Sequence, residues 1–303
     1  MALQALSFSH SVRRLSHKGF NFDSHNEQKS VQDLVELISA FLAGILATFV
    51  PLFIGLFTPN WLTKIRAGPR AHVFLAALSA GIIFWFFLDV MGDAALLDVN
   101  QGFRADDYYQ AASHIALALL FAIGLGILVM LDRRFRKSGA DDNIAASNAM
   151  STPLTLTFAI ASVAALGIGF HALGEGIEIG SNLPNSADIL EAIGGVLPGV
   201  AYVLHKFLEG FVIGVFAVLA SAVSARKLGI LGVISGVPTI VGFILGLPSG
   251  LDASYFFALG GAGAMYIEIR LLPLIFRGRL QYFSVVALLL GFYAMYFAGL
   301  FHG

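Results

Sequence analysis

Long apolar stretches recur along the chain between short polar segments. A bilayer core of roughly 30 Å requires about 20 apolar residues for each spanning helix, and several turn signals, such as Pro59-Asn60 and Pro184-Asn185, separate stretches of that length. The pattern predicts eight spanning helices, near residues 31–57, 73–92, 112–131, 153–180, 198–223, 229–247, 253–274 and 281–301.

The start of the chain has a different character. Residues 1–30 are polar and include Arg13, Arg14 and Lys18, and they lack the apolar run of a signal peptide. We therefore expect two parts, a mobile extracytoplasmic tail over residues 1–30 and a transmembrane domain over residues 31–303.

Composition supports a membrane-spanning, all-α fold. The 303 residues are 57% hydrophobic and only 12% charged, which is more apolar surface than one soluble core buries. The formal net charge of -1 and the scattered basic residues indicate no nucleic-acid-binding face. Because the chain has no cysteine, any metal ion must be bound by nitrogen and oxygen atoms.

Basic residues favour one set of connections. Those after the first, third, fifth and seventh apolar stretches hold Lys64, Arg66, Arg70, Arg133, Arg134, Arg136, Lys137, Arg226, Lys227, Arg277 and Arg279. The opposite connections hold only Arg104. By the positive-inside rule the basic connections are cytoplasmic, so an even number of spans places both termini outside.

Shared features of distant stretches hint at an internal repeat. Pro51 and Pro238 lie within the first and sixth stretches, and small-residue patches occupy residues 78–81 and 260–263 of the second and seventh. If helices one to three correspond to helices six to eight, the two copies are inverted, which is an arrangement that supports alternating access.

Two pairs of ionisable residues fall within the fourth and fifth stretches. His171 and Glu175 are four residues apart, as are His205 and Glu209, so each pair shares one helix face with roughly 5 to 6 Å between Cβ atoms. Ionisable groups at membrane depth are costly, which favours a bound ion, and Lys206 adds a fifth such group. The alternative is two hydrogen-bonded packing pairs without a metal.

Two imidazoles and two carboxylates suit zinc, and also iron, manganese, cobalt, nickel or cadmium. The two motifs resemble those of the ZIP (Zrt/Irt-like) metal transporters, and so do the eight spans, the external termini and the division into three, two and three helices. The resemblance covers the chain from residue 31 onward. It implies that His171, Glu175, His205 and Glu209 line the transport site.

The resemblance also implies a mode of action. The expected protein is a secondary transporter of a divalent metal ion, most of all zinc, toward the cytoplasm, and not an enzyme. An elevator-like movement within a homodimer in the plasma membrane is the family expectation. Its partners are the lipid bilayer and the transported ion, and no other cofactor is expected.

Departures from the family pattern bear on the number of metal ions. Ala172 stands where the family has asparagine, Lys206 stands where it has an acidic residue, and residues 229–247 contain no Asp or Glu. A second metal ion is therefore not expected. Our hypothesis is that the Lys206 ammonium replaces it and neutralises one of the carboxylates Glu175 and Glu209; the alternative is that Lys206 extends toward the outer interface.

Other charged residues have two readings each. Glu178, Asp89 and Asp93 lie at the outer ends of their helices, where they form an entry path for cations or remain ordinary solvated charges. Glu268 and Arg270 do not share a helix face, and we expect them to serve in packing or to extend toward the interface.

Two rival functions remain open at the level of sequence. One is a membrane-embedded metal-dependent hydrolase, although the chain has no His-Glu-x-x-His helix and no clear nucleophilic serine. The other is a metal sensor that does not transport.

Overall fold

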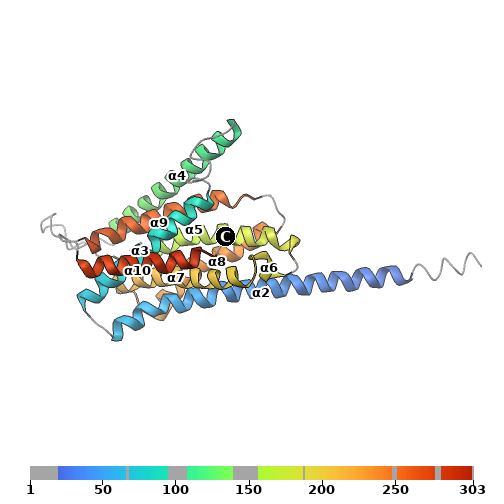
Figure 1. The fold of residues 1–303 in the computed structure, drawn as a ribbon, viewed down its shortest axis with the longest axis horizontal. Helices are drawn as coiled ribbons and strands as arrows, with labels where there is room; N and C mark the ends of the chain where they lie inside the picture. The colour runs from blue at the N-terminus through green and yellow to red at the C-terminus, as the bar shows by residue number, and fades with distance from the viewer. Residues whose placement is uncertain are drawn as a thin grey trace, which may run out of the picture. The chain divides into compact units, whose positions relative to one another are not determined.

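The computed structural model describes residues 20–65, 68–94, 108–138, 156–186, 188–247, 251–276 and 281–301, and within these ranges the protein consists of helices joined by short turns, without strands (Figure 1). The predicted all-α class is confirmed. The helices are α2 (Phe20–Ile65), α3 (Pro69–Asp93), α4 (Tyr108–Ser138), α5 (Phe158–Asn182), the 3-10 helix η1 (Leu183–Asn185), α6 (Ile189–Ala192), α7 (Val196–Leu219), α8 (Ala225–Gly246), α9 (Ser254–Ile275) and α10 (Tyr282–Gly299).

The chain divides into two compact units, Met1–Gly44 and Ile45–Gly303. In the first unit the structure describes the α2 residues from Phe20 onward, so residues 20–30 of the predicted tail are helical. Residues 1–19 of that tail lie outside the described part of the chain. The features below belong to the second unit.

Eight of the described helices are long and apolar enough to cross a membrane, as predicted, and they support an integral membrane protein. Their apolar spans are Gly44–Ile65, Arg70–Asp93, Ser113–Phe135, Phe158–Asn185, Val196–Leu219, Ala225–Gly246, Ser254–Ile275 and Tyr282–Gly299. Seven of these lie within a few residues of the predicted stretches.

The end predicted for the first span was wrong. The structure describes this apolar span from Gly44 onward, and it extends to Ile65 and does not end at residue 57. The predicted turn at Pro59 does not occur, since Pro59 lies inside α2. A membrane helix tolerates an internal proline where neighbouring helices pack against it.

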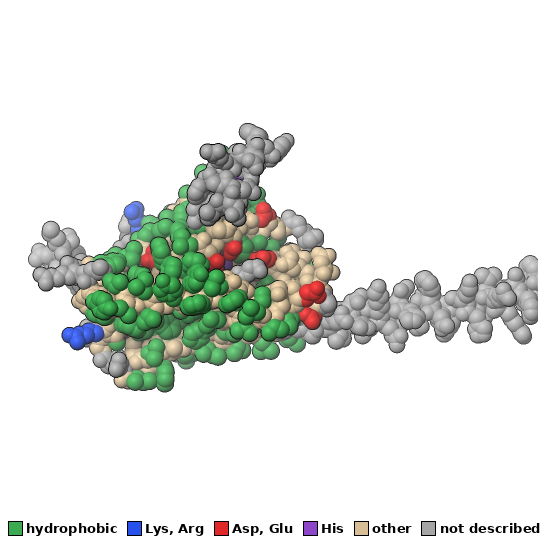
Figure 2. Space-filling model, in the orientation of Figure 1, with side chains coloured by type: hydrophobic (Ala, Val, Ile, Leu, Met, Phe, Trp, Pro, Cys, Tyr) green, Lys and Arg blue, Asp and Glu red, His purple; other side chains and the backbone are tan. Residues whose placement is uncertain are grey.

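Charged side chains separate along the bundle. One end, here called the basic end, carries Lys64, Arg70, Arg133, Arg134, Arg226 and Lys227. The opposite, acidic end carries Asp93, Glu178, Asp188, Glu191 and Asp252. In Figure 2 most visible acidic side chains gather away from the visible lysine and arginine side chains. An apolar surface lies between them, as expected for a protein surrounded by lipid.

Glycines bring several pairs of helices into backbone contact. Side chains at these positions would collide with the partner backbone, namely at Gly176 against Thr239, at Gly210 against Leu52 and at Gly81 against Leu288. The contacts join α5 to α8, α7 to α2 and α3 to α10. Close approach at small residues is a common basis of helix association in membranes, where no hydrophobic driving force operates between helices.

The helices α5 and α7 lie at the centre of the bundle. The bundle buries 78% of the α7 span and 67% of the α5 span, against 17% of the α4 span. Most of both helices is therefore shielded from lipid, which is the environment that ionisable side chains require.

A buried ion pair joins α4 to α9. The Arg270 guanidinium donates to the Asp132 carboxylate, and both side chains are buried. Arg270 therefore serves in packing, which is one of the two expectations from the sequence, and does not extend toward the interface. The pairing could not be read from spacing, because the two residues are far apart in the chain.

We predict that Arg270→Gln destabilises the protein. The substitution removes the Arg270 charge from the buried Asp132 carboxylate, and loss of one partner of a buried pair costs about 3 to 5 kcal/mol. Unfolding of purified protein in detergent would measure this loss. The matched control is Arg134→Gln, which removes an exposed arginine from α4, the helix that carries Asp132. Equal losses of stability in the two variants would contradict the prediction.

Candidate metal centre

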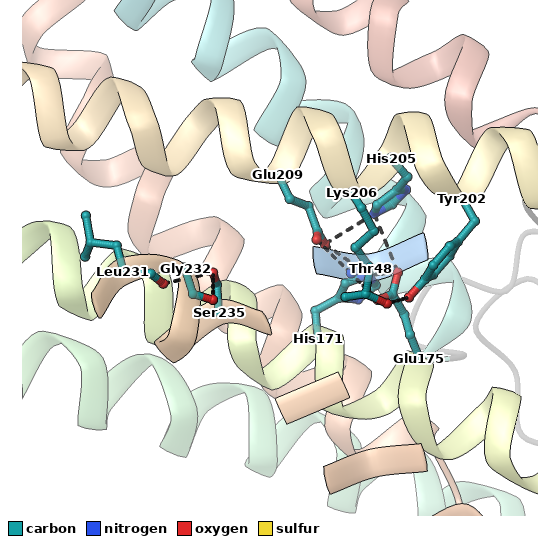
Figure 3. A network of polar contacts seen from close by, with 10 residues as sticks. All are labelled: Thr48, His171, Glu175, Tyr202, His205, Lys206, Glu209, Leu231, Gly232 and Ser235. Carbon is teal, nitrogen blue, oxygen red and sulfur yellow. Dashed lines mark hydrogen bonds and ion pairs between the residues drawn. The ribbon is translucent and has the colours of Figure 1, made fainter. Parts of the chain in front are cut away.

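Four ionisable side chains meet between α5 and α7. His171 and Glu175 come from α5, whereas His205 and Glu209 come from α7, and all four are buried. One ligand atom from each lies within 4.8 Å of all the others. We call these four residues the tetrad (Figure 3). The structure thus brings together all four residues that the sequence singled out as ligands.

Distances within the tetrad approach those around a four-coordinate metal ion. His171 Nε2 lies 3.2 Å from Glu175 Oε1 and 3.7 Å from Glu209 Oε1. His205 Nε2 lies 3.9 and 3.4 Å from the same two oxygens. Ligand atoms on a zinc tetrahedron stand roughly 3.4 Å apart, from bond lengths of about 2.0 to 2.2 Å. Small side-chain movements would therefore complete such a site.

Lys206 contacts the outer oxygens of both carboxylates. Its Nζ donates to Glu209 Oε2 at 2.7 Å and also contacts Glu175 Oε2. The side chain is 0% exposed, so it does not extend toward the outer interface. The single ammonium charge, which the hypothesis assigns to one carboxylate, thus lies between both of them.

The two carboxylates consequently divide their oxygens between two tasks. Both Oε2 atoms face the Lys206 ammonium, while both Oε1 atoms face the imidazoles. Within the described chain Glu175 Oε1, Glu209 Oε1 and His171 Nε2 take part in no hydrogen bond. Buried polar atoms normally have partners, so this convergence of unsatisfied nitrogen and oxygen atoms is suited to a cation.

Aromatic rings close the tetrad on the side of α3 and α9. The Phe86 ring centroid lies 4.6 Å from that of His171 and 5.5 Å from that of His205, and Phe257 lies 5.4 Å from His171. A side chain at Gly260 would collide with His171, so only glycine fits there. These neighbours could not be predicted from the sequence.

A second polar contact lies beside the tetrad. The hydroxyl groups of Thr48 and Tyr202 are hydrogen-bonded at 2.9 Å, which joins α2 to α7 (Figure 3). The Tyr202 ring also lies 5.6 Å from Lys206 Nζ, within the range of a cation–π interaction. Tyr202 therefore touches the cation that organises the tetrad.

A cavity of about 330 Å³ opens beside Tyr202 at the acidic end of the bundle. Glu175 and Tyr202 contribute to its lining, together with Asp93, Glu178, Ile179, Asn182, Asn185, Ser186, Glu191, Ala192, Ile193, Gly194 and Pro198. The cavity thus reaches from exposed carboxylates to a member of the tetrad. Of the residues considered for an entry path, Glu178 and Asp93 line it, whereas half-buried Asp89 does not.

The donor set defines what the centre can hold. Two nitrogen and two oxygen ligands without a thiolate suit zinc and the similar divalent ions. The neighbouring α8 offers no Asp or Glu, so the described residues give a second metal ion no additional carboxylate from that helix. With neutral imidazoles, Glu175, Glu209 and Lys206 carry a net charge of -1, which a single divalent cation reverses to +1.

Comparison with protein-family models gives no match for this chain, and comparison with curated protein sequences gives none either. The geometry of the centre and the two His-x-x-x-Glu motifs are therefore the features that bear on function.

Proposed function

We propose that this protein transports a divalent transition-metal ion, most of all zinc, across a membrane through a single site formed by the tetrad. The observation that carries the proposal is the convergence of two imidazoles and two carboxylates in the middle of two central, membrane-spanning helices. Intramembrane ionisable residues of this kind usually mark an ion pathway.

The surroundings of the tetrad favour an ion path over catalysis. A hydrolytic zinc needs an open position for water and space for a substrate, whereas the four ligand side chains here are at most 2% exposed. The cavity ends at Glu175, so it can deliver an ion but offers a larger substrate no access to the imidazoles. A sensor without transport is the remaining rival.

The charge pattern suggests the direction of transport. Cations would collect in the acidic cavity, and the positive-inside rule assigns the basic end to the cytoplasm. We therefore propose movement toward the cytoplasm, with both termini outside and the plasma membrane as the location. This agrees with the resemblance to the ZIP transporters.

Helix contacts suggest which parts move. The glycine contacts join α5 to α8 and α7 to α2, so these four helices can act as one group that carries the tetrad. The second group would comprise α3, α4, α9 and α10. Between them, Gly167 of α5 meets Gly263 of α9 without intervening side chains, which suits sliding in an elevator-like cycle, expected within a homodimer.

Zinc uptake into sealed vesicles that contain the purified protein tests the proposal, with cadmium, iron and manganese for comparison. We expect saturable uptake that is absent from protein-free vesicles, and weaker binding at low pH because protons compete for the ligand atoms. Zinc binding without uptake would favour a sensor, and neither binding nor uptake by folded protein would exclude both metal functions.

A further prediction concerns entry into the centre. Tyr202→Phe removes the hydrogen bond to Thr48 and keeps the ring, and one such bond is worth about 1 kcal/mol, or roughly a fivefold change in an opening equilibrium. We expect zinc association and dissociation to accelerate together with little change in Kd, measured by stopped-flow mixing with a fluorescent chelator. Exposed Tyr293→Phe is the control; unchanged rates in Tyr202→Phe would show that this contact does not limit entry.

A further inference from the structure

Glu268 is a buried carboxyl group to which the proposed transport site assigns no role. It lies on α9 about two turns before Ile275, or roughly 10 Å from that end of the helix. It is only 8% exposed. On the same helix, Gly260 touches His171 at the level of the tetrad. Glu268 therefore lies between the tetrad and the basic end, roughly 12 Å along the helix from Gly260.

No polar partner accompanies this carboxyl group in the described chain. Glu268 Oε1 is buried and takes part in no hydrogen bond, and no ion pair includes the residue. The helix α9 packs against α3, α4 and α5. In α5, no ionisable residue lies between Phe158 and Phe170.

The charges on the other neighbouring helices are already engaged or distant. In α4, Asp132 pairs with Arg270, which is two residues from Glu268 and so points to a different side of α9. The other ionisable residues of α3 and α4 toward the basic end whose side chains the structure describes are exposed, namely Arg70, His72, Arg133 and Arg134. No described cation therefore balances an ionised Glu268.

The free-energy cost of burying an unpaired charge determines the protonation state of Glu268. An ionised carboxylate without a partner costs far more in an apolar interior than the neutral acid does. We propose that Glu268 is a proton-binding site within the membrane, which holds a proton in the packed bundle and releases it when the basic end opens to water. The carboxylic acid then becomes a carboxylate and a hydrated proton, and rebinding of a proton restores the acid on closure.

The position of Glu268 links this proton to the transport cycle, and this part of the inference rests on the proposed function. When α5 and α7 move along α9, water that reaches the tetrad from the basic end must pass the level of Glu268. A carboxylate formed there would attract the departing metal ion. The proton must return before the bundle closes again, because closure would otherwise bury an unpaired charge.

Infrared difference spectroscopy of lipid-reconstituted protein tests proton binding without any need for transport. We expect a carbonyl band of a protonated carboxylic acid that shifts in heavy water and disappears in Glu268→Gln. The control, Asp252→Asn, removes an exposed carboxylate at the start of α9 and should leave that band unchanged. If wild type and Glu268→Gln show the same protonated-acid bands, Glu268 is ionised and the proposal is wrong.

Zinc uptake then tests the link to transport. Glu268→Gln mimics a permanently bound proton, so we expect turnover to fall roughly tenfold or more while zinc affinity stays unchanged. Glu268→Asp keeps a titratable group and should retain part of the turnover. Full turnover in Glu268→Gln would overturn the link. Failure of the proposed transport function would give a different result. Wild type itself would then show no zinc uptake, while the infrared band of Glu268 would persist.

Discussion

Zinc affinity should fall at least about 100-fold when His171 and Glu209 are both replaced by alanine. Loss of a residue that merely supports a ligand already costs roughly 10 to 100-fold in affinity, and this variant loses two direct ligands from two different helices. The expected change corresponds to about 2.7 kcal/mol or more of binding free energy. Competition with a fluorescent zinc chelator, on purified protein, would measure it.

The same substitutions should leave the protein folded. In wild type, Lys206 balances only one of the two carboxylates it contacts. Without Glu209, the remaining Glu175 and Lys206 form a neutral buried pair. The metal-free variant is therefore expected to unfold at a temperature no lower than wild type.

Asp252→Asn provides the matched control, since it removes an exposed carboxylate away from the tetrad. It should bind zinc as wild type does. A folded His171→Ala/Glu209→Ala variant with wild-type affinity would place the metal site elsewhere in the protein, and it would remove the basis for the proposed transport function.

The fold could be predicted from the sequence because each spanning helix has a recognisable apolar stretch. A bilayer requires a minimum apolar length, and charged or turn-forming residues between such lengths mark where the chain leaves the membrane. The error at Pro59 shows the limit of that reasoning. Proline usually ends a helix, but here α2 continues to Ile65 within the bundle, where α7 packs against it.

The tetrad was accessible to sequence analysis for a similar reason. Four-residue spacing fixes His171 against Glu175, and His205 against Glu209, within each helix. The spacing within each helix does not show that the two ionisable faces meet. That prediction depended on the cost of leaving ionisable groups unpaired in a membrane. The structure brings the two faces together.

Neighbours from distant parts of the chain could not be predicted. Phe86 and Thr48 carry no motif, and their places beside the tetrad follow from how α3 and α2 pack. The pairing of Arg270 with Asp132 likewise depends on the packing of α9 against α4. Tertiary contacts of this kind have no periodicity along the sequence.

The position of Lys206 has a consequence that spacing alone did not reveal. One ammonium holds both Oε2 atoms, so the two carboxylates are kept close together with both Oε1 atoms turned toward the imidazoles. The Lys206 ammonium would thus arrange the carboxylates in advance for the proposed metal ion. Such preorganisation reduces the cost of binding.

Lys206→Met is therefore expected to make the stability of the protein depend more strongly on zinc. Without zinc, two carboxylates would face one another in a buried site with no counter-charge, and loss of one partner from such a site costs about 3 to 5 kcal/mol. Zinc should offset this cost, so unfolding with and without zinc should differ more in the variant than in wild type. Exposed Lys227→Met is the control and should behave as wild type.

The number of bound metal ions provides the sharper measurement. Removal of the ammonium leaves both Oε2 atoms open to a second cation, so zinc titration of Lys206→Met should show a second, weaker site, whereas we expect wild type to bind one ion. Transport should be altered but not abolished, since all four ligands remain. A stable Lys206→Met variant that binds one ion with wild-type affinity would mean that Lys206 is not a substitute for a second metal. A folded variant without any uptake would instead give Lys206 an essential part in movement of the ion.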